Sequence, residues 1–401
     1  MSWITDPAFA ASEPFGPQTL PYGVFSTADN GFRSVGVRVG DHVLDISELP
    51  SLPSRELLVG GSLDALLAAG HPAWSTLRAA LTDMVLAAAA PPGAVLHPLP
   101  SVRLHLPFTV ADYVDFYSSR HHAENAGRIF RPDAAEPLLP NWTHLPVAYH
   151  GRAGTVVVSG TPVVRPSGQS KPHNADSPVC GPTRRLDVEA EVGFVCGGPV
   201  RSRVPVEDVA EHVFGVALVN DWSARDIQAW ESQPLGPFLG KSFATSISAW
   251  VTPLEALESA RVLLAPPPHP LVPYLDGTAP WGLDLSLQVR WNGTMVSRPP
   301  FASMSWSCAQ QLAHLTVNGA TVRPGDLFAS GTVSGPSRDQ VGSFLELTWG
   351  GREPVTLDSG QSRTFLEDGD TVEITATAPG PAGSIVGLGA VTGRVVPGPT
   401  E

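Results

Sequence analysis

Three acidic side chains occupy alternate positions in the segment LDVEAEVGFV, which begins at Leu186. If the segment is a strand, Asp187, Glu189 and Glu191 share one face, and apolar side chains fill the other. Cβ atoms two positions apart on a strand lie about 7 Å apart, so neighbouring carboxylates could reach one hard cation. The alternative is an ordinary solvated strand face. Like charges side by side cost energy, and a divalent cation would compensate for it.

A fourth acidic residue ends a near-continuous apolar run over residues 213–219, which indicates a buried strand. Asp221 follows that run in the segment NDWSARD, so its carboxylate would stand at the mouth of the strand. That is a good position for a metal ligand. Alternatively, Asp221 caps a short helix through Gln228, a role that Ser223 could fill equally well.

The segment ADYVDFYSSRHHAENAGRIFRP combines groups suited to proton transfer. Asp115 and Tyr117 would share a face if the chain is extended there, and Ser118 or Ser119 would then cap a helix that carries His121, His122 and Glu124. A histidine beside an acid and a tyrosine can accept a proton near neutral pH. The alternative is a pair of surface histidines.

Mostly β structure is expected to position these groups. Alternating or apolar patterns predict strands within residues 155–166, 186–197, 212–221, 283–293, 343–351 and 370–378. Helical patterns are fewer, at about residues 118–130, 206–213 and 303–315. Near the N-terminus, residues 22–48 alternate around a Gly40-Asp41 turn, and residues 54–90 have the Leu and Ala spacing of two helices.

A Pro-rich stretch over residues 91–107 predicts a boundary, which gives an N-terminal domain over 1–105 and a second domain over 106–401. Only 16% of the 401 residues are charged and 42% are hydrophobic, which excludes intrinsic disorder for most of the chain. The net charge of -13 and the lack of a basic stripe argue against a nucleic-acid partner.

The remaining global features point to a cytoplasmic setting. Three widely spaced cysteines without a C-x-x-C pair argue against a disulfide framework or a thiolate zinc site. The N-terminal stretch MSWITDPAFAASEPFG lacks the regions of a signal peptide, and the longest apolar run, residues 84–90, is too short to cross a bilayer. We therefore expect neither secretion nor a membrane partner.

One phosphate-binding pattern is incomplete. The segment GPFLGKS, from Gly236 to Ser242, has three residues between its glycines where a P-loop requires four. The pattern therefore does not predict a nucleotide site.

Longer segments of the chain resemble the fumarylacetoacetate hydrolase family. They are DFYSSRHHAENAGRIFR, LLPNWTHLPVAYHGRAGTVVVSGTP, LDVEAEVGF, NDWSARDIQAWE, PLGPFLGKSF and RPGDLFASGTVSGP, and they stand in family order from about residue 108 onwards. The resemblance implies an SH3-like small β-barrel domain followed by a larger mixed β-sandwich or β-roll catalytic domain. It also implies a homodimer that hydrolyses a carbon–carbon bond of 4-fumarylacetoacetate, a diketone with two carboxylates, to fumarate and acetoacetate at the end of tyrosine and phenylalanine catabolism.

The same resemblance assigns the site residues, each by its match to a family motif. The metal ligands for Ca²⁺ or Mg²⁺ fall on Asp115, Glu189, Glu191 and Asp221, and a second cation site falls on Asp221, Lys241 and Thr245. The general base falls on His122 with Glu346 as its orienting carboxylate, and the oxyanion groups on Arg225, Gln228 and Lys241. Substrate contacts fall on Tyr117, Arg131, Tyr149, Gln228 and Thr332.

Two positions depart from the family pattern. Ser232 stands where the family often has a substrate-contacting tyrosine, and Ala244 replaces a glycine beside the second cation site. The alternative activities are those of related superfamily members: acylpyruvate hydrolases, oxaloacetate decarboxylases and hydratases. A non-catalytic, metal-stabilised scaffold is disfavoured because His122, Lys241 and Gln228 are all present.

Overall fold

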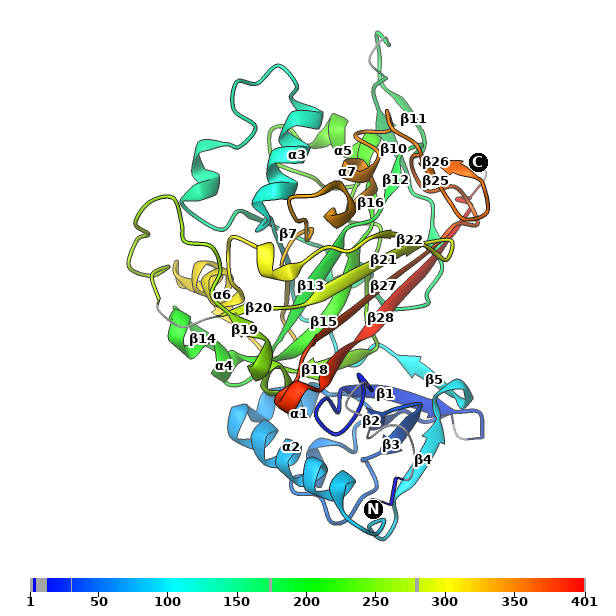
Figure 1. Cartoon of the computed structure of the whole chain (residues 1–401), viewed down its shortest axis with the longest axis vertical. Coiled ribbons are helices and arrows are strands. Elements are labelled where there is room, and N and C mark those ends of the chain that lie inside the picture. The colour runs from blue at the N-terminus through cyan, green and yellow to red at the C-terminus, as the bar shows by residue number, and fades with distance from the viewer. Residues whose placement is uncertain (1–2, 5–12, 30, 173–174, 278–280, 400–401) are drawn as a thin grey trace.

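Strand pairing dominates the chain, and the expectation of a mostly β protein is confirmed. The computed structural model describes residues 3–4, 13–29, 31–172, 175–277 and 281–399. The largest sheet runs in the order β4-β3-β2-β1-β18-β15-β13-β24-β6-β7, with β5 beside β1, and β17 and β8 beyond β15 (Figure 1). Its strands are β1 (Tyr22–Thr27), β2 (Ser34–Val39), β3 (His42–Asp45), β4 (Val95–Pro98), β5 (Val102–His105), β6 (Tyr113–Phe116), β7 (Ala148–His150), β8 (Val156–Val158), β13 (Ala190–Cys196), β15 (Val213–Asp221), β17 (Thr245–Ile247), β18 (Trp250–Pro253) and β24 (Leu327–Ala329).

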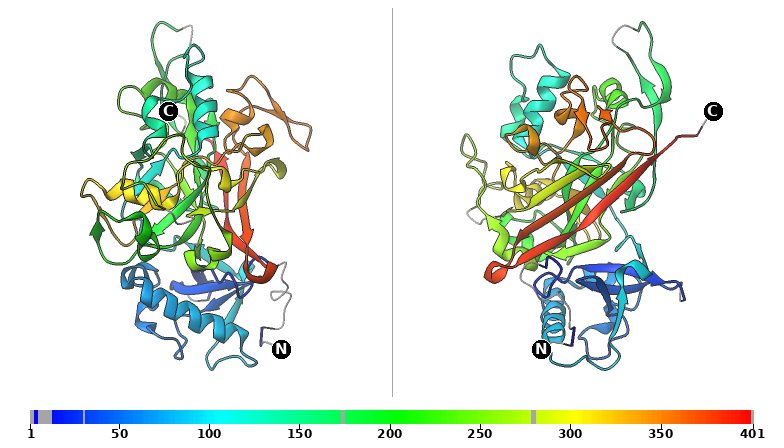
Figure 2. Two further views of the ribbon diagram at one scale, coloured as in Figure 1. Left: turned by 60° about the vertical axis from the view of Figure 1, so that its left-hand side comes forward. Right: turned by 45° about the vertical axis from the view of Figure 1, so that its right-hand side comes forward.

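A second, five-stranded sheet contains the two long C-terminal strands, which cross the body diagonally (Figure 2). In order it contains β22 (Thr294–Ser297), β21 (Ser286–Trp291), β27 (Thr371–Pro379), β28 (Ile385–Val396) and β9 (Val163–Val164). Side chains of both sheets share one core, which includes Val192 and Leu218 from the first sheet and Val289, Ile374 and Val391 from the second. The two sheets therefore pack face to face as a sandwich.

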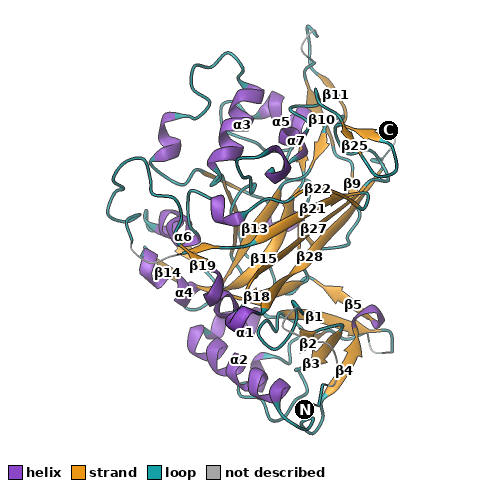
Figure 3. Cartoon of the chain, in the orientation of Figure 1, coloured by secondary structure: helices purple, strands orange, loops and turns teal. Residues whose placement is uncertain are grey.

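Short two-stranded ladders and helices complete the chain, with most helices gathered along one side of the sheets (Figure 3). The ladders pair β10 (Ser167–Ser170) with β11 (Val179–Pro182), β12 (Leu186–Asp187) with β16 (Ser223–Ala224), β14 (Arg201–Ser202) with β23 (Thr321–Val322), β19 (Arg261–Val262) with β20 (Gly282–Leu283), and β25 (Val355–Thr356) with β26 (Ser362–Arg363). The helices are α1 (Asp64–Ala69), α2 (His71–Leu86), α3 (Arg120–Phe130), α4 (Val209–His212), α5 (Arg225–Glu231), α6 (Cys308–Thr316) and α7 (Phe344–Leu347).

The N-terminal strands form a small β unit, as the alternating pattern predicts. The β2–β3 hairpin turns through Gly40 and Asp41, and Gly40 has a φ of 55°, which a residue without a Cβ adopts at little cost. Two helices, α1 and α2, follow within the predicted range. Among the described residues the strand pairings follow an open path, so a closed SH3-like barrel is not observed.

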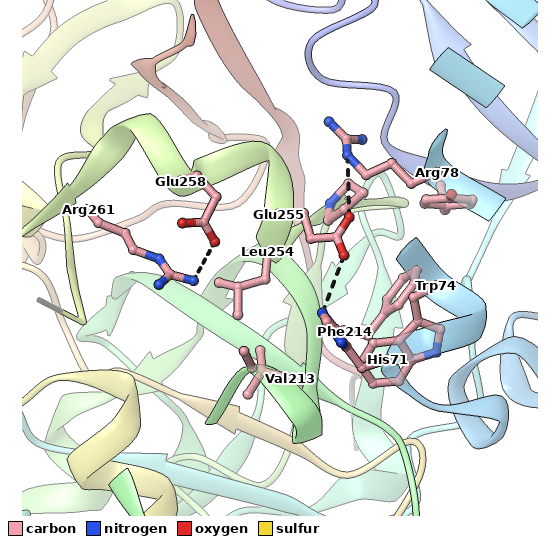
Figure 4. A pocket seen from close by; sticks show the side chains of 12 residues that line it. His71, Trp74, Arg78, Val213, Phe214, Leu254, Glu255, Glu258 and Arg261 are labelled. Atoms are coloured by element: carbon pink, nitrogen blue, oxygen red, sulfur yellow. Dashed lines mark hydrogen bonds and ion pairs between the residues drawn. The ribbon is translucent and has the colours of Figure 1, made fainter. Parts of the chain in front are cut away.

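The N-terminal unit is joined to the main body by backbone and by side chains. Strand β1 pairs with β18, with Tyr22 opposite Val251. In Figure 4, His71 and Arg78 of α2 face Glu255 of the main body around a cavity of about 30 Å³. One apolar cluster also continues across residue 105, from the N-terminal strands and helices to strands of the main body. The two parts therefore share a core.

One predicted strand is wrong. Residues 343–351 were expected to be extended, but residues 344–347 form helix α7. The hydroxyl of Ser343 accepts a hydrogen bond from the backbone N–H of Glu346, which caps the helix at its N-terminus. The predicted helices are present, although α4 covers only residues 209–212 of the predicted 206–213, and α6 begins later than residue 303. No helix among the described residues is long and apolar enough to cross a membrane.

Candidate active site

Four carboxylates from three segments meet at one end of the large sheet. Asp115 lies on β6, Glu191 on β13 and Asp221 at the end of β15, and Glu189 directly precedes β13. Each offers an oxygen atom, and these four atoms all lie within 4.8 Å of one another. All four side chains are buried, so the alternative of a solvated strand face does not apply to Glu189 and Glu191.

The chemistry of this cluster fits a divalent cation. Three of its buried oxygens, Oδ1 of Asp115 and both carboxylate oxygens of Glu191, have no hydrogen-bond partner. Burial, together with the neighbouring acid Asp221, raises the pKa of Asp115 well above its usual range, and burial with Asp115 does the same for Glu191. Buried carboxylate oxygens without partners repel one another, and a bound Ca²⁺ or Mg²⁺ would compensate for that repulsion. Oxygen atoms are also the ligands that these cations prefer.

A lysine ammonium and a tyrosine hydroxyl form hydrogen bonds with other oxygens of the cluster. The ammonium of Lys241 donates to Oε2 of Glu189 at 2.5 Å and to Oδ2 of Asp221 at 2.7 Å. Tyr149 lies opposite Asp115 in the β6–β7 pairing, and its hydroxyl lies 2.8 Å from Oδ2 of both Asp115 and Asp221. Burial alone would raise the pKa of Glu189, but the charges of Lys241 and Arg225 and the hydrogen bond from Lys241 together outweigh it, and the pKa falls well below its usual range.

The prediction of a second cation at Asp221, Lys241 and Thr245 is not tested by these contacts. The hydroxyl of Thr245 donates to Oδ1 of Asp221 at 3.0 Å, because β15 and β17 place the two residues opposite each other. Asp221 therefore accepts hydrogen bonds from both Lys241 and Thr245. A cavity of about 120 Å³ opens beside them and is also lined by Tyr149.

Arg225 brings a second positive charge to the cluster. Its Nη1 atom lies 2.7 Å from Oε1 of Glu189 and donates to Oε1 of Gln228, one turn along α5, at 3.0 Å. Its Nε atom donates to Asp187 at 2.8 Å. Its Nη2 atom is buried and has no partner, so both N–H groups of that nitrogen remain free.

Asp187 has a structural role that its alternation with Glu189 and Glu191 in the sequence does not predict. Besides accepting from Arg225, its carboxylate accepts hydrogen bonds from the backbone N–H groups of Phe344 and Leu345, at 2.8 and 2.9 Å. It therefore joins α5 to the first turn of α7 and does not enter the four-carboxylate cluster.

A buried histidine and glutamate form the second centre of the site. The hydroxyl of Ser119 accepts from the N–H of His122 and so begins α3, as one of the two predicted caps. The Nδ1 atom of His122 lies 2.7 Å from Oε2 of Glu346 on α7. Burial would raise the pKa of Glu346, but the facing His122, together with hydrogen bonds from Asn125 and Ser343, outweighs it and lowers the pKa.

Three further side chains hold Glu346, and the sequence analysis did not identify them. Asn125 donates to Oε1 at 3.0 Å, while the hydroxyls of Ser334 and Ser343 donate to Oε2 at 2.9 and 2.8 Å. Asn125 lies one turn after His122, and Ser343 precedes Glu346 in an S-x-x-E pattern, so both had a local signal. Ser334 reaches Glu346 only through the tertiary fold.

The predicted substrate contacts differ in their surroundings. The ring of Tyr117 packs edge-on against His122 with 5.3 Å between centroids. The hydroxyl of Thr332 is buried without a partner and is therefore free to bind a ligand. Arg131 is exposed and donates to the carbonyl of Pro137, and it lies near enough to Tyr117 to oppose the effect of burial, which raises the pKa of that tyrosine.

The two departures from the family pattern are accommodated locally. The hydroxyl of Ser232 donates to the carbonyl of Gln228 at the end of α5. Ala244 is buried and is not among the described residues with positive φ, so no glycine-like backbone is required there.

Comparison with known families decides the relationship. A family model described as "Fumarylacetoacetate (FAA) hydrolase C-terminal" matches residues 112–396, and one described as "Fumarylacetoacetase N-terminal" matches residues 18–107. The chain belongs to the fumarylacetoacetate hydrolase family. Curated family members named fumarylacetoacetase include those of Rattus norvegicus, 45% identical, and Homo sapiens, 43% identical, each with 97% of both chains covered. The one from Arabidopsis thaliana is 42% identical, with 96% of both chains covered.

Solved structures share the fold at much lower identity. A fumarylacetoacetate hydrolase from psychrophilic Exiguobacterium antarcticum is 18% identical with a TM-score of 0.58, over 94% of this chain and 99% of the other. A maleylpyruvate hydrolase from Sphingobium is 16% identical with a TM-score of 0.55, over 94% of this chain and 100% of the other. The fold therefore occurs in proteins named for more than one activity, so the fold alone does not define the activity of this chain.

Proposed function

We propose that this chain hydrolyses 4-fumarylacetoacetate to fumarate and acetoacetate, the last step of tyrosine and phenylalanine catabolism. The observation that carries the proposal is the pairing of the buried four-carboxylate cluster with the His122–Glu346 dyad. The relatives at 42–45% identity, which bear the name of this activity, match the N-terminal part as well as the catalytic part.

His122 is the base of the reaction. With its Nδ1 proton held by Glu346, the imidazole presents Nε2, the unprotonated nitrogen of that tautomer, to a water molecule. As Nε2 takes the proton, the hydroxide forms a bond to the carbonyl carbon on the fumaroyl side. Glu346 stabilises the resulting imidazolium, as its existing hydrogen bond to His122 allows.

Donors around Arg225 and Lys241 stabilise the tetrahedral oxyanion. The donors are the free Nη2 of Arg225, the amide of Gln228 and the ammonium of Lys241. Their closeness is supported by the bonds of Arg225 to Gln228 and Glu189, and of Lys241 to Glu189. The carbon–carbon bond then breaks, and its electron pair leaves on the acetoacetate carbon as an enolate. His122 returns the proton to that carbon, so water is consumed and two acids are released.

Ca²⁺ or Mg²⁺ would be held by Asp115, Glu189, Glu191 and Asp221. When bound, such an ion would polarise the diketone oxygens and favour the enolate form of the leaving group. The all-oxygen donor set supports a hard cation and disfavours zinc. A second cation beside Asp221, Lys241 and Thr245 remains part of this proposal, with Lys241 contributing only its backbone carbonyl, because its ammonium donates to Glu189 and Asp221.

The substrate carries a carboxylate at each end, and the proposed contacts fit that charge. Arg131 offers a bidentate fork near Tyr117, and Tyr149, Gln228 and Thr332 supply further polar groups for the substrate.

We also propose a cytoplasmic homodimer. All three cysteines are free, which suits a reducing compartment. Large apolar side chains are exposed beside the site, with Leu235 96% and Phe238 65% exposed, and a second copy of the chain would cover them. Light scattering on the purified protein tests the dimer: a monomer at micromolar concentration would contradict it.

Hydrolysis in H₂¹⁸O separates this activity from those of related family members. We expect one ¹⁸O atom in the fumarate carboxylate and none added to acetoacetate when the products are analysed by mass spectrometry. An acylpyruvate hydrolase, a decarboxylase or a hydratase would instead leave 4-fumarylacetoacetate intact and act on acylpyruvates, oxaloacetate or an unsaturated acid.

A further inference from the structure

The segment GPFLGKS, from Gly236 to Ser242, resembles an incomplete P-loop, and its backbone binds the carboxylate of Glu231. After α5 ends at Glu231, the chain passes through Gly236 and returns along residues 238–241. The N–H groups of Phe238 and Gly240 donate to Oε1 of Glu231 at 2.8 and 2.7 Å, and that of Leu239 donates to Oε2 at 3.0 Å. Three consecutive amides therefore surround one carboxylate, as such loops surround a phosphate.

This carboxylate acts on the segment that carries Lys241. The N–H of Lys241 donates to the carbonyl of Phe238 at 3.1 Å, and the carbonyl of Gly240 accepts from Ala224 at 2.8 Å. Next in the chain, the Lys241 ammonium reaches Glu189 and Asp221. Glu231 therefore fixes the backbone of residues 238–240, and that backbone fixes where the next residue, Lys241, places its ammonium.

Close packing leaves the segment little freedom beside the oxyanion groups. A Cβ atom on Gly240 would lie 2.9 Å from the backbone N of Gln228, too close for any real side chain. Arg225, Gln228 and Glu231 are spaced three apart and lie along one side of α5. One face of α5 therefore carries the oxyanion donors Arg225 and Gln228. The same face holds residues 238–240, which precede the third donor, Lys241.

We propose that Glu231 is a positioning residue: its carboxylate, held by three backbone N–H groups, sets the place of Lys241 for the hydrolysis proposed above. Among the described residues no lysine, arginine or histidine forms an ion pair with Glu231, so its charge is balanced by these amides alone. This inference rests on the proposed function, because it assigns Lys241 a role in that reaction.

The test compares Glu231→Gln in the wild-type chain and in a Lys241→Ala chain. The amide substitution keeps the shape but points an N–H₂ group at backbone donors, so at least one charge-assisted bond is lost. We expect kcat for 4-fumarylacetoacetate to fall about 10- to 100-fold with KM within about threefold. In the Lys241→Ala chain the same substitution should change kcat by less than about twofold. Glu231 acts by positioning the Lys241 ammonium, so it has no further effect once that ammonium is absent.

Hydrogen exchange supplies a readout that does not depend on activity. The amides of residues 238–240 should exchange at least about tenfold faster in Glu231→Gln, while Glu353→Gln, which removes a surface ion pair with Arg338, should leave both exchange and kcat unchanged. Gly240→Ala is the second variant, because it displaces the same segment and leaves the carboxylate intact. It should reproduce the fall in kcat.

The inference is overturned if Glu231→Gln keeps wild-type kcat, if the exchange of residues 238–240 is unaltered, or if kcat falls equally in both backgrounds. Equal losses would mean a general structural effect. A wild-type chain that does not hydrolyse 4-fumarylacetoacetate contradicts the proposed function instead, and faster exchange in Glu231→Gln would still support the contact between Glu231 and the segment.

Discussion

The Nδ1 atom of His122 lies 2.7 Å from Oε2 of Glu346, although 224 positions separate the two residues in the chain. Both side chains are buried, and Glu346 accepts three further hydrogen bonds from Asn125, Ser334 and Ser343. The carboxylate is therefore held as an acceptor only, and the imidazole is held in one tautomer and one orientation.

Glu346→Gln tests that orientation. An amide nitrogen facing the His122 or serine donors would break the acceptor-only arrangement and favour the wrong tautomer. We expect kcat to fall about 10²- to 10⁴-fold, in the range of a general base that has lost its function, while KM changes little. Steady-state kinetics at saturating metal measures the effect, and Glu353→Gln is the surface control. A Glu346→Gln variant that matches both the control and the wild type would refute the role of Glu346.

His122→Ala should separate the base from the metal centre. We expect kcat to fall about 10²- to 10⁴-fold, because water then loses its proton acceptor. Cation affinity measured by calorimetry should stay within about threefold of wild type, since His122 is not among the four clustered carboxylates. A variant that retains near-wild-type kcat would show that another group takes the proton.

Cation binding should release protons and strengthen as the pH rises. Burial and neighbouring carboxylates raise the pKa of both Asp115 and Glu191, so these groups bind protons more tightly in the metal-free chain and a cation must compete with those protons. A carboxyl whose pKa is raised by folding stabilises the metal-free chain below its unfolded pKa, and that contribution is lost as the pH rises through the folded pKa.

The melting-temperature gain from added Ca²⁺ or Mg²⁺ should therefore increase with pH from 5 to 8. Differential scanning calorimetry with and without chelator measures it, and titration in buffers of different ionisation enthalpy counts the protons released. A gain that is independent of pH, with no proton release, would contradict a shared site at Asp115 and Glu191.

Ser232→Tyr should lower KM with little change in kcat. Ser232 stands one turn after Gln228, and a tyrosine there could place its hydroxyl in direct contact with a substrate oxygen. Ser232→Ala is the matched control, because it removes only the hydrogen bond to the Gln228 carbonyl and should leave KM unchanged. Kinetics of Ser232→Tyr identical to wild type would mean that this position never meets the substrate.

The sequence predicted most local structure near the site, because the signals there are local. The apolar run before Asp221 predicted a buried strand, and the serines before His122 predicted the start of α3. The same kind of signal was missed at residues 343–347, where alternating apolar residues suggested a strand although the S-x-x-E cap favours a helix.

What the sequence could not predict depends on contacts between distant segments. Spacing alone placed Asp187 beside Glu189 and Glu191, whereas the fold turns it toward Arg225 and the first turn of α7. Two other contacts likewise form only once distant or looping segments pack together. They are the hydrogen bond from Ser334 to Glu346 and the hydrogen bonds from the backbone of residues 238–240 to Glu231. The roles of the individual site residues came from family resemblance and remain predictions for mutagenesis.

The most direct test of the central claim is the loss of 4-fumarylacetoacetate absorbance with purified protein, metal-loaded and after chelation. The account predicts turnover by the loaded enzyme, no turnover with chelator, recovery when Ca²⁺ or Mg²⁺ is restored, and no recovery in an Asp115→Ala variant. Undiminished turnover in the chelated protein, or in Asp115→Ala without any cation, would contradict it.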